Sequence, residues 1–115
     1  MNEITYYKEE RPWGSFEQFA KNEPVTVKII TVKAGEAFSL QTHEKREEFW
    51  RALSGEGKIT FGETIEDIQV GKDYHIKTGM KHRIEAGASD VVILEVARGV
   101  FDEDDIIRLD DKYGR

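Results

Sequence analysis

The sequence predicts an all-β fold, a sandwich or barrel of jelly-roll type. Short segments rich in β-branched and aromatic residues recur along the chain, and glycine-containing turns separate them. The periodicity of an amphipathic helix is almost absent. With 115 residues the chain has room for one domain with its own hydrophobic core, so we expect a single domain of antiparallel strands.

Eight segments carry the strand signal. The first is rich in Val, Ile and Thr and stops at Gly35, while a later pair flanks residues 62–64 as a β-hairpin does. We expect strands at residues 25–33, 38–42, 47–53, 58–61, 65–70, 74–77, 82–85 and 91–96. The expected domain, 1–115, then divides into an N-terminal arm (1–24), a barrel core (25–98) and a C-terminal tail (99–115).

The composition argues against several classes of protein. Asp and Glu outnumber Lys and Arg by 23 to 17, and this acidic balance disfavours a nucleic-acid partner, which calls for a basic surface. The absence of cysteine excludes disulfides and thiolate zinc sites. Residues 1–10 are polar, unlike a signal peptide, and no apolar run reaches the ~20 residues that cross a bilayer. We therefore expect a cytoplasmic protein with no membrane partner.

Four residues suggest a metal site. Gln41, His43 and Glu48 lie close together in one segment, and His82 begins a later strand. Two imidazoles, one carboxylate and one amide oxygen suit a single divalent first-row metal ion with positions left open for a substrate. Such a set accepts zinc, our first choice, and also manganese, iron, cobalt or nickel.

The alternation of side chains along a strand indicates which residues share a cavity with these ligands. Trp50 lies on the same face as Glu48, and Arg46 can point to the mouth of the cavity. Glu95 interrupts an apolar strand, and a carboxylate is costly to bury without a partner, so it is a candidate cavity residue. An exposed sheet edge is an equal alternative for Glu95. The acidic residues 102–105 predict a solvated turn in preference to a cation site.

The metal-site segments resemble the two cupin motifs. Gln41 stands where the first motif has its first His, and Lys77 stands where the second motif usually has proline. The matching residues are Gly35, Gln41, His43, Glu48 and Gly55 in the first motif and Gly71, Gly79 and His82 in the second. The resemblance implies a cupin jelly-roll β-barrel in which Gln41, His43, Glu48 and His82 bind the metal.

Within the cupins, the chain resembles the type II phosphomannose isomerases, in particular the C-terminal isomerase domain of bifunctional mannose-1-phosphate guanylyltransferase/mannose-6-phosphate isomerases. It departs from them at Glu44, Lys45 and Phe49, where members often carry histidine. No glycine-rich nucleotide loop is present, so guanylyltransferase activity is not expected. The segments that carry the resemblance are RPWGSF (11–16), LQTHEKREEFW (40–50), KHR (81–83), EDDIIR (103–108) and DKYGR (111–115).

The resemblance implies a metal-dependent aldose–ketose isomerase that converts mannose 6-phosphate to fructose 6-phosphate in polysaccharide precursor metabolism. Glu95 and Lys81 are candidates for the general base, with His75 as a third. Two alternatives remain open. One is another metal-cupin enzyme, an epimerase or a dioxygenase, and the other is a non-catalytic cupin that binds a sugar or a sugar nucleotide.

A sugar phosphate needs positive charge at its binding site. Arg46 is the first candidate because a guanidinium can bind phosphate through two hydrogen bonds, and Lys81 and Arg108 follow. Trp50 would form a wall against the sugar. The expected partners are a small-molecule sugar phosphate and a second copy of the chain, because jelly-roll sheets have edges that need covering.

Overall fold

The computed structural model describes residues 6–102 and 104–110, and these form strands joined by turns and loops. All strand pairs are antiparallel. The strands are β1 (Tyr7–Arg11), β2 (Gly14–Gln18), β3 (Val25–Val32), β4 (Leu40–Thr42), β5 (Arg46–Ser54), β6 (Gly57–Phe61), β7 (Thr64–Asp67), β8 (Asp73–Ile76), β9 (His82–Ala86), β10 (Val91–Gly99) and β11 (Ile107–Asp110).

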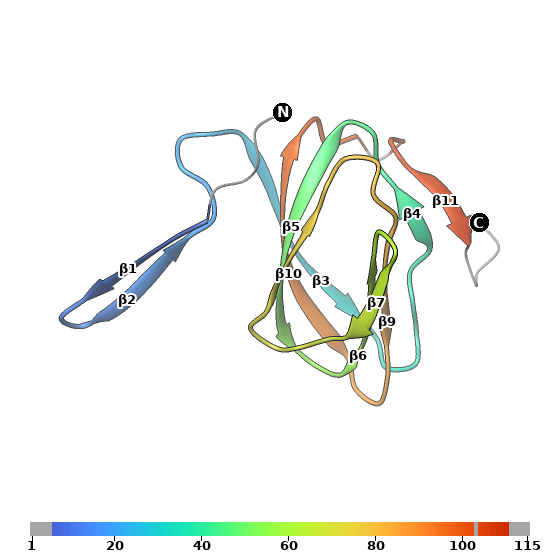
Figure 1. Ribbon diagram of the computed structural model, residues 1–115, viewed down its shortest axis with the longest axis horizontal. Helices are drawn as coiled ribbons and strands as arrows, with labels where there is room; N and C mark the ends of the chain where they lie inside the picture. The colour runs from blue at the N-terminus through green and yellow to red at the C-terminus, as the bar shows by residue number, and fades with distance from the viewer. Residues whose placement is uncertain (1–5, 103, 111–115) are drawn as a thin grey trace.

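Two sheets face each other and enclose the core, as Figure 1 shows. One sheet has the strand order β3-β10-β5-β8, and the other has the order β11-β4-β9-β6-β7. Strands that are neighbours in the sequence are often in different sheets, as a jelly roll requires. The predicted all-β jelly-roll fold is confirmed.

The strand boundaries differ from the predicted ones where the alternation of side chains is weak. Residue 38 lies outside β4, and Ala37 forms only an isolated bridge to Glu85. The apolar run that begins at Val91 continues as a strand to Gly99. Strands β1, β2 and β11 were not predicted, because their mostly exposed residues show no apolar face that would mark them as strands.

The inner face of the barrel changes from apolar to polar along β5 and β10. Ala52 lies opposite Ile93, and both side chains are almost fully buried. Further along the same strands Glu48 and Glu95 take the inward positions, also buried. The apolar core consists of Val32, Trp50, Ala52, Ile59, Tyr74, Ile76, Ile84, Ala86, Val91 and Ile93. A polar site therefore sits against one end of a well-packed core.

The turn after β5 explains one of the motif glycines. Gly55 has a φ angle of 103°, a conformation that side chains disfavour. A Cβ atom at this position would lie 2.0 Å from the carbonyl oxygen of Asp90. Only glycine allows the chain leaving β5 to approach the start of β10 this closely.

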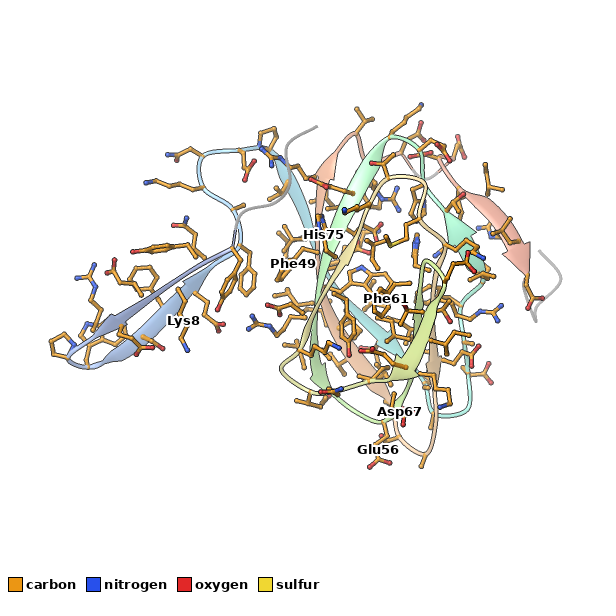
Figure 2. All side chains as sticks on the ribbon, in the orientation of Figure 1. Lys8, Phe49, Glu56, Phe61, Asp67 and His75 are labelled. Atoms are coloured by element: carbon orange, nitrogen blue, oxygen red, sulfur yellow. The ribbon has the colours of Figure 1, made fainter. Side chains whose placement is uncertain are left out.

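The hairpin β1–β2 projects from the side of the barrel (Figure 1). Phe19, which follows it, packs against Phe49 on the outer face of β5, with ring centroids 5.2 Å apart. Phe49 lies on the side of the barrel nearest the hairpin (Figure 2). Within the described ranges, no helix has the length and apolar character needed to cross a membrane.

Candidate functional site

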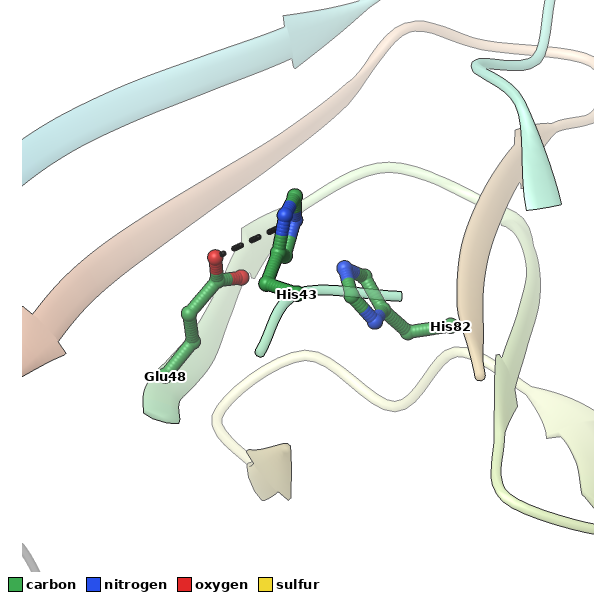
Figure 3. Close-up of side chains that lie close together, drawn as sticks. All are labelled: His43, Glu48 and His82. Carbon is green, nitrogen blue, oxygen red and sulfur yellow. Dashed lines mark ion pairs between the residues drawn. The ribbon is translucent and has the colours of Figure 1, made fainter. Parts of the chain in front are cut away.

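Three side chains from separate segments meet inside the barrel, as Figure 3 shows. His43 follows β4, Glu48 lies in β5 and His82 begins β9. One ligand atom from each lies within 4.8 Å of the others, and all three residues are buried. His43 Nε2 is 3.6 Å from Glu48 Oε2. Two imidazoles and a carboxylate in this arrangement could hold a divalent cation.

Hydrogen bonds to the backbone determine which nitrogen each imidazole presents to the cluster. Nδ1 of His43 donates to the carbonyl oxygen of Asp105 at 2.6 Å, and Nδ1 of His82 donates to that of Met80 at 2.9 Å. Because a carbonyl oxygen only accepts, the proton is on Nδ1 and each Nε2 keeps its lone pair. This is how metal-ligating histidines are usually held.

The Nε2 atom of His82 is buried and has no hydrogen-bond partner in the described part of the chain. Leaving such an acceptor unpaired costs about 1–3 kcal/mol. Burial lowers the pKa of His82, which favours the neutral imidazole that a metal ion needs. The residues therefore fit a divalent ion.

Gln41 lies beside this cluster. It pairs with His82 across β4 and β9, and its side chain lines a cavity that His43 and Glu48 also line. The side-chain oxygen of Gln41 accepts a hydrogen bond from Ser39 Oγ at 3.3 Å. A coordinating role for Gln41 stays a prediction.

Arg46 occupies part of the space that a metal ion would use. Its Nε donates to Glu48 Oε2 at 2.8 Å, and its Nη2 donates to His43 Nε2 at 3.1 Å. The neutral imidazole nitrogen has one lone pair, so His43 cannot accept this hydrogen bond and bind a metal ion at once. Metal binding through His43 Nε2 must therefore displace the guanidinium. The sequence placed Arg46 at the cavity mouth, whereas the structure buries it against these residues.

Replacing Arg46 with Met is expected to raise the affinity for zinc by roughly tenfold, because it removes a hydrogen bond between charged or polar partners that competes with the ion. Competition with a chromogenic chelator measures this affinity. Arg51→Met is the matched control, since Arg51 pairs with Asp73 and Glu17 away from the site. Unchanged or weaker zinc binding by the Arg46 variant would show that the guanidinium does not compete.

Glu95 and Glu48 line the same cavity, and both are buried. Burial, followed by the negative charge of Glu48, raises the pKa of Glu95 to about 8. Burial also acts to raise the pKa of Glu48, but the neighbouring Glu95, His82 and Arg46 lower it overall. Glu95 is only 4% exposed, which excludes the sheet-edge alternative.

These groups share one cavity of about 190 Å³. Its wall combines acids, histidine, amide, cations and apolar side chains, a composition suited to a small polar ligand. The lining residues are Lys28, Ile30, Phe38, Gln41, His43, Arg46, Glu48, Trp50, Glu95, Phe101, Ile106 and Arg108. Trp50 and Arg108 thus lie where the sequence placed them, against the cavity.

Lys81 and His75 do not reach this cavity. The Nζ atom of Lys81 lies 3.0 Å from a carboxylate oxygen of Glu63, and the Lys81 carbonyl accepts a hydrogen bond from the backbone of Gly62. These contacts direct Lys81 toward the β6–β7 turn, so the structure does not support the catalytic and phosphate-binding roles expected for it. His75 contacts Glu47 at 3.1 Å on the opposite side of the sheet (Figure 2).

Sequence reasoning missed Lys28 and Phe101. Lys28 lies directly opposite Glu95 in the β3–β10 register. Alternation along residues 25–33 places Lys28 on the same face as Ile30 and Val32, and this signal could have identified it. Phe101 follows β10 in an irregular segment, and no pattern in the sequence marks it as a cavity residue.

The tail contributes a residue that positions His43. Besides the carbonyl contact to His43, the carboxylate of Asp105 accepts hydrogen bonds from the backbone N–H groups of Glu44 and Lys45, each at 2.9 Å. These backbone hydrogen bonds, led by that from Glu44, lower the pKa of Asp105. Residues 102–105 were predicted as a solvated turn, and Asp104 is exposed as expected, but Asp105 is half-buried against the site. Glu103 lies outside the described residues.

Asp105→Ala is expected to weaken zinc binding by about 10- to 100-fold, the usual effect of losing a group that orients a metal ligand. Without its carboxylate the segment after His43 is no longer held to the tail. Isothermal titration with zinc measures the change. Asp104→Ala removes the same charge one residue away and should leave the affinity as it is. Equal affinities for the two variants would contradict a positioning role for Asp105.

The chain matches a known family and known proteins over most of its length. The family described as mannose-6-phosphate isomerase C-terminal matches residues 2–111. The chain is 39% identical to a mannose-1-phosphate guanylyltransferase of Salmonella montevideo over 97% of its length, covering 24% of that protein. It is 36% identical to the xanthan biosynthesis protein XanB of Xanthomonas campestris over 99% of its length, covering 25% of that protein. The chain thus spans about a quarter of the length of these curated relatives.

Solved structures share the fold. A cupin protein from Bacteroides fragilis superposes with a TM-score of 0.60 and 27% identity, over 66% of each chain. The capsular polysaccharide assembling protein CapF from Staphylococcus aureus gives a TM-score of 0.64 and 24% identity, over 92% of this chain and 34% of CapF. Both similarities support a cupin barrel.

Proposed function

The chain belongs to the family of mannose-6-phosphate isomerase C-terminal domains, and from this premise we propose that it is a metal-dependent isomerase that interconverts mannose 6-phosphate and fructose 6-phosphate. The observation that carries the proposal is a buried His43–Glu48–His82 cluster, two of whose members, His43 and Glu48, line the same cavity as Glu95. The cluster could hold a divalent ion, and the carboxyl group of Glu95 can take and return a proton.

The reaction moves one proton between C1 and C2 of the sugar and a second proton between the two oxygens. Negative charge develops on oxygen when the carbon-bound proton leaves. A divalent ion held by His43, Glu48 and His82, with Gln41 as a fourth candidate, would supply Lewis-acid stabilisation of that charge. Zinc is the first ion to test, and manganese, iron, cobalt and nickel are the others.

Glu95 is the proposed general base. A carboxylate with a raised pKa is a stronger base than an ordinary glutamate, and at a pKa of about 8 a fraction of it is already ionised at neutral pH. It would accept the proton from C2 and return it to C1, which requires its carboxyl group to lie within hydrogen-bonding reach of both carbons. Trp50 and Phe38 flank the cavity and would exclude water from the exposed carbanion-like centre.

The proposal is tested by assaying the purified protein for conversion of mannose 6-phosphate to fructose 6-phosphate. The protein is first stripped with EDTA and then supplied with zinc, manganese, cobalt, iron or nickel in turn. We expect the stripped protein to be inactive and at least one ion to restore turnover. Metal binding without turnover under any of these ions would reject the isomerase and favour a cupin that only binds its ligand.

A further inference from the structure

More cationic than anionic side chains line the cavity. Lys28, Arg46 and Arg108 line it together with only two carboxylates, those of Glu48 and Glu95. Even with both carboxylates ionised, one positive charge is in excess, and a divalent ion would add to it. The whole chain has a formal net charge of −6, so the positive excess in this cavity is opposite in sign to the charge of the chain. This excess favours an anionic ligand.

Two of the cations, Lys28 and Arg46, contact the same aromatic ring, that of Phe101. Lys28 Nζ lies 3.9 Å from the ring centroid of Phe101, and Arg46 Cζ lies 4.1 Å from it. The two positive charges are therefore no farther apart than the sum of these distances. The ring face stabilises each cation. The carboxylate of Glu48, 2.8 Å from Arg46 Nε, offsets part of this positive charge, and an anionic ligand would offset more of it.

Arg46 also has an unused hydrogen-bond donor. Its Nε and Nη2 groups donate to Glu48 and His43, but Nη1 is buried and has no hydrogen-bond partner among the described residues. The side chain is only 8% exposed, so bulk water does not readily take that place. A buried guanidinium donor that lines a cavity calls for an acceptor supplied by the ligand.

We propose that Lys28 and Arg46, on the ring of Phe101, bind the phosphate group of the substrate, and that Lys28 sets the preference for a phosphorylated sugar over a neutral one. This inference rests on the proposed function and adds a specific residue to it. Phosphate oxygens would accept hydrogen bonds from Lys28 Nζ and from the guanidinium of Arg46, which metal binding displaces from His43. The sugar would then extend from these cations along the cavity that Glu95 also lines.

The test measures equilibrium binding by calorimetry and needs no turnover. Zinc-loaded wild type, Lys28→Met, Lys28→Arg and Lys33→Met are titrated with mannose 6-phosphate, inorganic phosphate and mannose. Lys33 directly follows the same strand, is exposed and lies outside this cavity, so its variant controls for the loss of one positive charge. Thermal unfolding of each variant checks that the fold is intact.

We expect Lys28→Met to bind mannose 6-phosphate and inorganic phosphate roughly 10- to 100-fold more weakly, the effect of losing a hydrogen bond to a charged group. Binding of mannose should not change, Lys28→Arg should retain most of the affinity, and Lys33→Met should match wild type. A folded Lys28→Met protein that binds mannose 6-phosphate as tightly as wild type would overturn the inference. So would a wild type that binds mannose as well as its 6-phosphate.

The two proposals fail in different ways. Phosphate-dependent binding that Lys28→Met weakens, without conversion to fructose 6-phosphate, would reject the isomerase and support the phosphate site. Conversion that proceeds in wild type, together with unaltered binding by Lys28→Met, would reject the phosphate site and leave the isomerase in place.

Discussion

His82→Ala is expected to abolish tight zinc binding and, with it, the conversion of mannose 6-phosphate. His82 supplies a buried Nε2 lone pair that no described residue uses, and its Nδ1–H is held by the carbonyl of Met80. Loss of a residue that only orients a metal ligand lowers metal affinity by roughly 10- to 100-fold, and the loss of a ligand itself should lower zinc affinity by more than that. Chelator competition measures the affinity, and a coupled assay for fructose 6-phosphate measures the rate.

His75→Ala provides the control for this substitution. His75 contacts Glu47 on the opposite side of the sheet and does not line the cavity, so its loss should leave zinc binding and turnover as in wild type. Retention of zinc affinity by His82→Ala would contradict the assignment of this residue as a ligand. Removal of a buried ring also leaves a cavity, so the unfolding midpoint of the metal-free protein must be compared for both variants.

The sequence predicted the parts of the fold and site that depend on local alternation. A period of two along residues 47–53 placed Glu48 and Trp50 on one face, and both are buried inside the barrel. Such positions can be predicted because a one-residue change of register would expose every apolar neighbour on the strand. Glu95 was a cavity candidate because it interrupts an apolar strand, whereas alternation alone left a sheet edge as an equal alternative.

Contacts between distant segments could not be predicted in this way. The carbonyl of Asp105 orients His43 across 62 residues of sequence, and a backbone acceptor leaves no mark in residue type. Phe101 comes to the cavity from an irregular segment for which no period exists. Arg46 was placed on the correct face, but its distance from His43 depends on how two loops close, which alternation does not determine.

Glu95→Gln is expected to lower kcat by about 10²- to 10⁴-fold, the usual contribution of a general base. The amide has nearly the same shape as the acid but cannot accept a proton from carbon. Like a protonated acid, the amide can donate a hydrogen bond to the nearby carboxylate of Glu48, so the metal cluster should keep its geometry. Zinc affinity and KM should therefore stay within a few-fold of the wild-type values.

A second readout separates proton transfer from a merely structural role of Glu95. Mannose 6-phosphate labelled with deuterium at C2 loses its label to water when an enzyme base removes that proton, and Glu95→Gln should suppress this exchange as strongly as turnover. Glu85→Gln, a strand glutamate paired with Arg83 outside the cavity, should exchange at the wild-type rate. A Glu95→Gln protein with unaltered zinc affinity and rapid exchange would show that another group carries the proton, because the amide cannot do so.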